Sequence, residues 1–360
     1  MHPASALDWL AQHRPEAGLT ARMSAAGLIT FAVAHLLGLT QIYWAVLTAV
    51  IVMQASVGGS LKAMLDRFIG TIGGAGWGVA VTLAIPHQSV LATGFALAVA
   101  LVPLAAVVAF QPSYRIAPVT AAIVLLANSS PAGVVDAALE RVLEIGLGSV
   151  IALGVALLVS PSRAQDLLCA AGRDALARMA DQVDLLLGGG AEPPDPAAVQ
   201  ALHDRIRMTI ERAAAIADEA ARERRSYITD APDPEPLVRT LRRLSHDLVI
   251  IARALTRPLP EPAAARLASP ALAVAGTLAA ALNDIGRALA SRSAPPDLTA
   301  LSDAMASFEA VLAALRREGL TRELPEEAVE RIFGVAFGLE QIGRNLGELA
   351  GRVGELADRR

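Results

Sequence analysis

Long uncharged stretches in the first 160 residues limit what this chain can fold into. The stretches that contain no Asp, Glu, Lys or Arg are residues 23–61, 68–114, 116–135 and 145–162. Charged side chains are rare in hydrocarbon, and one membrane-spanning helix takes about 20 residues. The stretches therefore hold two, two, one and one such helices. The sequence predicts six membrane helices, over residues 19–38, 41–57, 68–86, 90–110, 114–128 and 141–160.

Polar segments between these spans are predicted to be turns at the membrane surface. They are "GLTQ" (38–41), "GGSLKAMLD" (58–66), "PHQS" (86–89), "QPSYR" (111–115) and "NSSPAGVVD" (128–136). Lys and Arg in short loops favour the cytoplasmic side. With the N-terminus inside, most basic residues of the first half face the cytoplasm, so both termini are predicted to be cytoplasmic. We expect a multi-pass protein of the bacterial inner membrane.

The second half of the chain has a different composition. The first 160 residues hold as many basic as acidic side chains, so the net charge of −4 belongs to residues 161–360. Apolar residues recur there with helical spacing between Pro- and Gly-rich breaks. The predicted helical stretches are 163–187, 197–226, 237–255, 271–291, 298–318 and 324–357. We therefore expect an all-α chain with a cytoplasmic N-terminal segment (1–18), a six-helix membrane domain (19–161) and a cytoplasmic helical bundle (162–360).

Several classes of function are disfavoured by the composition and motifs. Arginine-rich segments such as "ARERR" (221–225) are interleaved with acidic residues, which argues against a nucleic-acid partner. His203 and His246 have no His or Cys partner at ligand spacing, so no metal is expected. The chain also lacks a P-loop, a dinucleotide-binding fingerprint and a Gly-x-Ser-x-Gly motif. We expect neither an enzyme nor a cofactor, and the single Cys169 allows no intramolecular disulfide.

Glycines are concentrated in the third predicted span, where each costs about 1 kcal/mol relative to alanine in a helix exposed to water. Gly70, Gly74 and Gly78 recur every four residues and form one stripe, which Gly73 and Gly76 would widen. In lipid, small residues let helix backbones approach closely. The stripe therefore predicts packing against another helix, or an unwound segment beside a cavity.

The two halves of the membrane domain resemble each other. "LDRFIGTIGG" (65–74) aligns with "LERVLEIGLG" (139–148) at a shift of 74, and "LTAVIV" (47–52) aligns with "VTAAIV" (119–124) at a shift of 72. Three helices per unit make two repeats of opposite orientation, as in many transporters. Arg67 and Arg141 are then equivalent, at the inner and outer mouths. They are interpreted as carboxylate-binding groups of an anion pathway, or as local ion pairs that anchor helix ends.

A family resemblance rests on the residues of this membrane half. "YWAVLTAVIVMQAS" (43–56), followed by Arg67, Gly70, Thr71 and Gly74, resembles the fusaric acid resistance or aromatic acid exporter family over about residues 20–160. The resemblance implies efflux of aromatic or other organic carboxylates, often with a periplasmic adaptor protein. The same superfamily includes plant aluminium-activated malate channels, which are homodimers. Because this chain has one membrane unit where longer exporters have two, we expect a homodimer.

Other residues are weaker candidates for the pathway. His35 is either a proton carrier in coupled export or an interfacial histidine, and Thr71 lies one turn after Arg67. Gln54 and Asn128 either line a cavity or satisfy neighbouring polar groups. Two alternatives to an exporter remain, namely a passive anion channel and a membrane scaffold that does not transport.

Overall fold

The computed structural model describes most of the chain and is helical throughout the described part. The described residues are 14–86, 88–127, 133–159, 163–188, 194–226, 228–255, 257, 260–261, 263–322 and 324–357. The chain divides into two compact units, residues 1–163 and 164–360. Each unit is described by itself.

The first unit contains the segments that were predicted to enter the membrane. Its helices are α2 (Arg14–Leu36), α3 (Ile42–Val52), α4 (Val57–Ala84), α5 (Val90–Phe110), the 3₁₀ turn η1 (Pro112–Tyr114), α6 (Ile116–Ala127) and α7 (Val134–Leu158). By length and composition, α2, α5 and α7 can each cross a membrane. The six-helix prediction gives the right number of helices among the described residues of this unit.

Two of the six predicted spans are shorter than expected. The helices α3 and α6 have 11 and 12 residues, which at 1.5 Å per residue is roughly 16–18 Å, about half of a hydrocarbon core. The segment "GGSLKAMLD" is also helical and belongs to α4, so the prediction of a surface turn there was wrong. Ser56 caps this helix by accepting a hydrogen bond from the backbone N–H of Gly59, and α4 therefore begins early.

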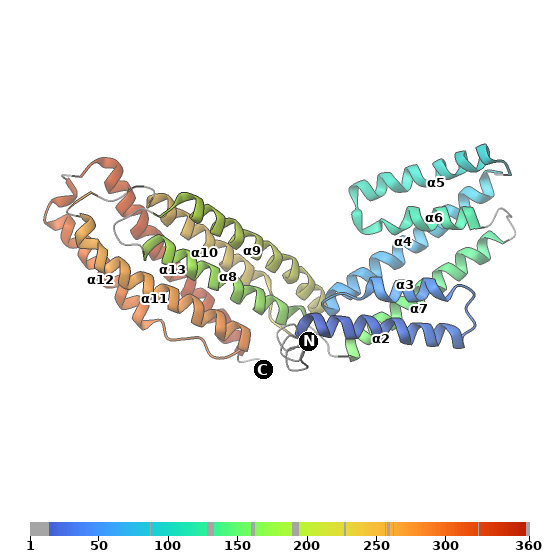
Figure 1. Ribbon diagram of the computed structural model, residues 1–360, viewed down its shortest axis with the longest axis horizontal. Coiled ribbons are helices and arrows are strands. Elements are labelled where there is room, and N and C mark those ends of the chain that lie inside the picture. The colour runs from blue at the N-terminus through green and yellow to red at the C-terminus, as the bar shows by residue number, and fades with distance from the viewer. Residues whose placement is uncertain are drawn as a thin grey trace, which may run out of the picture. The chain divides into compact units, whose positions relative to one another are not determined.

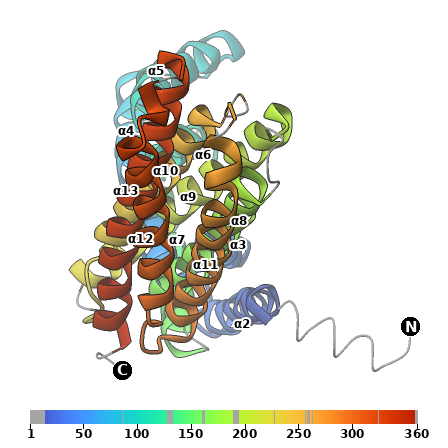
Figure 2. The ribbon, with the colours of Figure 1, turned by 90° about the vertical axis from the view of Figure 1, so that its left-hand side faces the viewer.

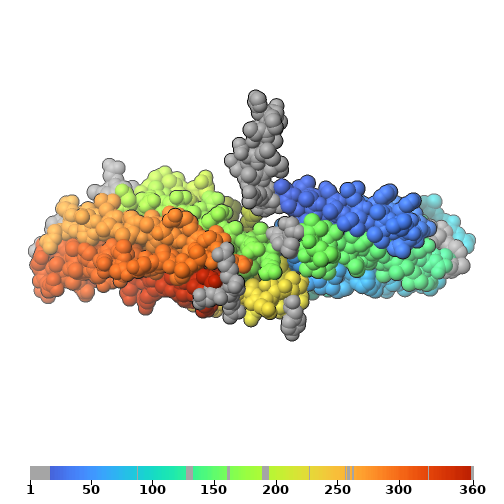
Figure 3. Space-filling model, turned by 90° about the horizontal axis from the view of Figure 1, so that it is seen from below, coloured from blue at the N-terminus to red at the C-terminus, as the bar shows by residue number. Residues whose placement is uncertain are grey.

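The six helices of the first unit fall into two groups of three, α2–α4 and α5–α7, whose corresponding helices run in opposite directions. In Figure 1, α4 and α7 run in opposite directions, as do α3 and α6. Helix α4 packs on α6 and α7, while α7 packs on α3 and α4. The outer helices also contact both groups of three. Helix α2 packs on α3 and α7, and α5 packs on α6 and α4. Figure 3 shows α2 (blue) lying along α7 (green). This exchange of neighbours is the arrangement expected of an inverted repeat.

The glycine stripe of α4 lies against α6. A Cβ atom on Gly70 would meet the side chain of Ile116, and one on Gly74 would overlap the backbone of Ala117. Gly78 is similarly close to Ala121, so these three glycines let α4 and α6 approach closely in the structure. Gly73 and Gly76 are exposed, and a Cβ atom added to either would have no neighbour within 4 Å. They take no part in the contact with α6, so the expectation that they widen the stripe was wrong.

The outer surface of the first unit is strongly apolar. Among the described residues, every exposed large apolar side chain belongs to this unit, except Met208, Leu272 and Phe337. Leu28, Phe95 and Leu143 are each more than 60% exposed. A surface of this kind is stable when it faces lipid rather than water.

The second unit is a bundle of long amphipathic helices around one apolar core. They are α8 (Ala164–Leu187), α9 (Pro196–Arg225), α10 (Glu235–Ala254), α11 (Ala263–Ser291), α12 (Thr299–Arg317), the 3₁₀ turn η2 (Leu320–Arg322) and α13 (Glu326–Ala357). Figure 2 shows these helices side by side, with α11, α12 and α13 nearest the viewer. The predicted helical stretches are confirmed, but α11 begins at Ala263 rather than near residue 271 and contains Pro270.

Helix α11 is long and apolar enough to cross a membrane by length and composition. Its apolar side chains are instead used inside the bundle, because Leu278, Ile285 and Leu289 are buried in the core of the second unit. Arg266, near its start, forms two hydrogen bonds to Glu318. A helix whose apolar face is already covered by protein has little to gain from lipid.

Candidate functional site

Arg141 of α7 is buried in the first unit, and its guanidinium forms no hydrogen bond with the described residues. The residue is 3% exposed, and none of its three guanidinium nitrogens has a hydrogen-bond partner among the described residues. Its guanidinium carbon lies 3.3 Å from the centroid of the Trp44 ring, at the start of α3. A cation over an indole ring is a favourable contact, but it leaves the in-plane N–H groups free to donate. This pair is the centre of the candidate site.

Gln41 holds Trp44 in place over the arginine. Its side-chain oxygen accepts hydrogen bonds from Trp44 Nε1 at 2.9 Å and from the Tyr43 hydroxyl at 3.0 Å. Its backbone N–H donates to Glu144 Oε1 at 3.0 Å, and Glu144 is 2% exposed. Glu144 lies one turn after Arg141 on α7. A single residue in the α2–α3 turn therefore connects the indole to the buried carboxylate.

Arg67 of α4 has a different environment from its repeat equivalent. It is 8% exposed, and its Nε donates to the Thr48 hydroxyl of α3 at 3.0 Å. The repeat equivalent of Thr48 is Thr120, whose buried hydroxyl has no hydrogen-bond partner in the described structure. The arginine–threonine contact is thus made in the first repeat and is not made in the second. Thr71, one turn after Arg67, is fully buried and its hydroxyl also lacks a partner among the residues that the structure describes.

Arg67 and Arg141 do not lie at opposite ends of the first unit, where the sequence had predicted them. Arg67 lies ten residues after the start of α4 and Arg141 seven residues after the start of α7, so neither is at a helix end. Arg141 contacts Trp44 and Arg67 contacts Thr48, one turn further along α3, so the two positive charges act on each other. Both guanidinium groups therefore lie inside the unit, where their charges repel each other while the buried Glu144 carboxylate attracts Arg141.

The remaining predicted site residues are not gathered at this centre. His35 is exposed and stacks on Phe31, with ring centroids 6.2 Å apart. The Gln54 side chain is exposed and donates to the carbonyl of Ile51. Asn128 lies outside the described residues.

Three residues of this part of the fold were not among the predicted site residues. They are Gln41, Trp44 and Arg22. Trp44 stands four residues before Thr48 and therefore shares its helix face. Arg22 is 2% exposed, and its Nη2 donates to the carbonyl of Ala55 at 3.0 Å. Its position inside the first predicted span was the available signal, because an arginine in a span is rarely without a role.

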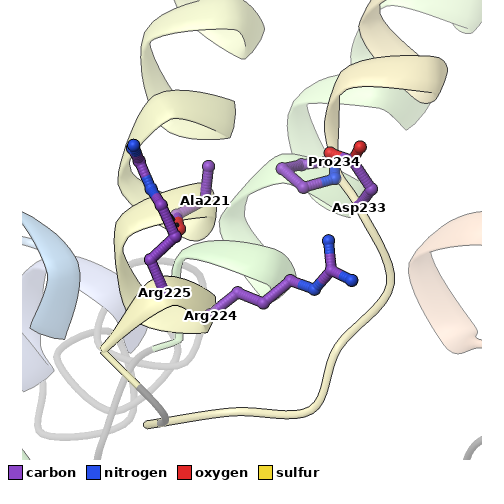
Figure 4. A pocket seen from close by; sticks show the side chains of 5 residues that line it. All are labelled: Ala221, Arg224, Arg225, Asp233 and Pro234. Atoms are coloured by element: carbon purple, nitrogen blue, oxygen red, sulfur yellow. Dashed lines mark hydrogen bonds between the residues drawn. The ribbon is translucent and has the colours of Figure 1, made fainter.

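Hollows in the second unit are open and lined by charged side chains. One, of about 410 Å³, lies between the end of α9 and the turn before α10; Figure 4 shows Arg224 extending below Asp233 and Pro234. Another, of about 430 Å³, lies between α10 and α13 and is lined by Arg239, Arg242, Arg243, His246, Asp247, Gln341 and Asn345. Burial raises the pKa of the Asp247 carboxyl, while the hydrogen bond from Asn345 opposes that rise. Among the described residues, no group of His, Cys, Asp and Glu is suited to hold a metal ion.

Comparison with known families identifies the chain at the level of its family. A family model described as the fusaric acid resistance protein family matches residues 17–338. The chain belongs to this family. Fusaric acid resistance proteins are membrane transporters of the efflux type, so this is a multi-pass membrane protein of a family of transporters rather than enzymes. No curated protein matches the chain.

The family match extends beyond the part of the chain in which the resemblance was seen. That resemblance covered about residues 20–160, whereas the match continues into α13. The helices of the second unit are therefore part of the family's pattern as well. Their alanine- and leucine-rich composition offers no short motif by which the likeness could be found by eye.

Proposed function

We propose that this protein exports organic carboxylate anions, aromatic ones among them, and that Arg141 binds the carboxylate. The observation that supports the proposal is the buried guanidinium of Arg141, whose three nitrogens have no hydrogen-bond partner among the described residues. A buried guanidinium whose N–H groups have no acceptor is destabilising by about 1–3 kcal/mol or more. A bound carboxylate removes this penalty, because it accepts two parallel N–H bonds from one guanidinium.

Two neighbours of Arg141 fit the same ligand. The charge of Arg67 also favours an anion between the two helices. Trp44 covers one face of the guanidinium, which leaves the edge of the group for a planar ligand. An aromatic carboxylate offers both a planar acid group and a ring that packs among apolar side chains.

The family and the apolar surface support a membrane location, and the remaining features of the assembly are part of the proposal. The distribution of Lys and Arg favours cytoplasmic termini in a bacterial inner membrane, with the second unit in the cytoplasm. A homodimer supplies the second membrane unit that longer exporters carry in one chain. A periplasmic adaptor completes the export route.

Flux of benzoate and malate into liposomes that contain the purified protein tests the proposal. The parent protein moves benzoate, and Arg141→Gln raises the half-saturating concentration on the order of tenfold to a hundredfold, for a lost charge-assisted contact of about 1.5–3 kcal/mol. Arg141→Lys recovers part of the affinity, since it restores the charge without the planar fork. Arg115→Gln is the matched control, because Arg115 is exposed in the same unit.

Two outcomes separate the alternatives. If Arg141→Gln moves benzoate as the parent and the Arg115→Gln control do, Arg141 is not the binding group. A proton-coupled exporter accumulates benzoate against its gradient when a pH difference is imposed. A passive channel only equalises the two concentrations.

A further inference from the structure

Arg22 of α2 is a third buried arginine in the same unit. Its Nη2 donates to the Ala55 carbonyl, and its Nε lies 3.4 Å from the Gly18 carbonyl. Its Nη1 is buried and has no hydrogen-bond partner in the described structure. No ion pair with a carboxylate is formed by Arg22 among the described side chains. The guanidinium charge is therefore buried without a compensating negative charge.

The surroundings of Arg22 add to its positive potential. Ala55 belongs to the non-helical segment between α3 and α4, one residue before Ser56, which caps α4. The first residues of α4, Val57 to Ser60, are buried. The N-terminus of a helix carries a partial positive charge from the helix dipole. Arg22 and the start of α4 thus concentrate positive charge in one buried place, which is a setting for an anion.

The three buried arginines lie in order along α3. Trp44 contacts Arg141 of α7, Thr48 contacts Arg67 of α4, and the segment that follows α3 contacts Arg22 of α2 at Ala55. Trp44 and Thr48 are separated by one helical turn, about 6 Å along the axis. The Ala55 contact lies three residues beyond the end of α3. Two positive groups therefore lie along α3, and a third lies beside the segment that follows it.

We propose that Arg22 is a separate anion-binding position, and that carboxylates pass along α3 between Arg22, Arg67 and Arg141. This inference rests on the proposed export of carboxylates. The contact of Arg22 with the Ala55 carbonyl occupies one of its N–H groups, and an arriving carboxylate takes the unpaired Nη1 and replaces that carbonyl. Transfer from one arginine to the next keeps the anion paired at every level, which lowers the barrier to crossing a low-dielectric interior.

Chemical modification of the unaltered protein is the first test. Phenylglyoxal reacts with accessible arginine side chains, and mass spectrometry of the peptides reports Arg22, Arg67 and Arg141 separately. Benzoate at saturating concentration is expected to slow the modification of Arg22 several-fold and to leave that of the exposed Arg115 unchanged. If Arg22 reacts at the same rate with and without benzoate, or does not react at all, it is not an anion-binding position.

Benzoate flux in liposomes is the second test, with variants that separate binding from folding. Arg22→Gln is expected to raise the half-saturating concentration at least tenfold, and Arg22→Lys by less. Ser56→Ala loosens the cap of α4 without removing the charge, so it is expected to leave that concentration near the parent value. An equal effect of Ser56→Ala and Arg22→Gln would show that Arg22 only holds the α3–α4 break.

The outcomes distinguish this inference from the proposed function. If the parent moves benzoate and Arg141→Gln impairs it while Arg22→Gln does not, the inference is wrong and the proposed function stands. If the parent moves no carboxylate, both fail. Should Arg22→Gln not fold, Arg22→Lys and the modification of the parent protein decide the matter.

Discussion

A Cβ atom placed on Gly148 of α7 would overlap the carbonyl oxygen of Ala45 on α3. The repeat equivalents of these residues, Gly74 and Ala117, have the same relationship between α4 and α6. The two contacts join helices that the repeat makes equivalent, since α4 with α6 corresponds to α7 with α3. The same close contact therefore occurs at both of these helix pairs, as an inverted repeat predicts.

These glycines are predicted to be intolerant of a single methyl group. Gly74→Ala and Gly148→Ala force two backbones apart and are expected to destabilise the protein by about 1–3 kcal/mol, the usual cost of overpacking. Gly73→Ala and Gly154→Ala are the controls, because a Cβ atom added at either position would have no neighbour within 4 Å. The measurement is the temperature at which the monodisperse particle is lost in detergent. Equal melting of all four variants would contradict the packing seen in the structure.

The indole of Trp44 is predicted to contribute directly to anion affinity. Trp44→Leu removes the ring over Arg141, and a cation–π contact is worth about 0.5–2 kcal/mol, which corresponds to roughly twofold to thirtyfold in the half-saturating benzoate concentration. Trp44→Phe keeps an aromatic face and is expected to lose less. Tyr43→Leu is the matched control, because the Tyr43 side chain is 55% exposed. A larger effect at Tyr43 than at Trp44 would place the site elsewhere.

The sequence predicts the helices of this protein better than it predicts the site. Uncharged stretches and helical periodicity follow from local composition, and they locate nearly all the helices. The early end of α3 is not evident from charge, because residues 53–57 are all uncharged. The helix ends where Arg22 donates to the Ala55 carbonyl, Ser60 accepts from the Gln54 backbone and Ser56 caps α4. Arg67 and Arg141 could be singled out as rare charges, whereas the role of Gln41 depends on a bond to Glu144, 103 positions away.

Asp247 of the second unit is predicted to make stability depend on pH. It is 6% exposed, and burial raises its pKa, so the folded state holds its proton more tightly than the unfolded state does. The ionised carboxylate therefore destabilises the fold above its folded pKa, and this penalty disappears as the pH falls below the unfolded value. Asp247→Asn is expected to melt at a higher temperature than the parent at pH 8, with a smaller difference at pH 4.

The control for this titration is Asp303→Asn, at an exposed position of α12. Both variants remove one carboxylate, so they change the net charge equally. Asn345 can donate to the new amide oxygen as it does to the carboxylate, so the hydrogen bond is retained. If Asp247→Asn melts lower than the parent at pH 8, the carboxylate stabilises the bundle and its desolvation is not the dominant effect.

The threonines at repeat-equivalent positions provide the most closely matched pair of substitutions. Thr48 accepts a hydrogen bond from Arg67, whereas the buried hydroxyl of Thr120 has no partner among the described residues. Thr48→Val removes a bond to a charged group and is expected to destabilise the protein by about 1.5–3 kcal/mol. Thr120→Val removes an unsatisfied buried hydroxyl, so it is expected to be neutral or to stabilise by roughly 1 kcal/mol. Heat unfolding of both variants in the same lipid nanodiscs measures the difference.

If the two variants lose the same stability, the Thr120 hydroxyl has a partner of its own. Arg141 is the partner that the repeat then implies, and the two halves would exchange these contacts during transport.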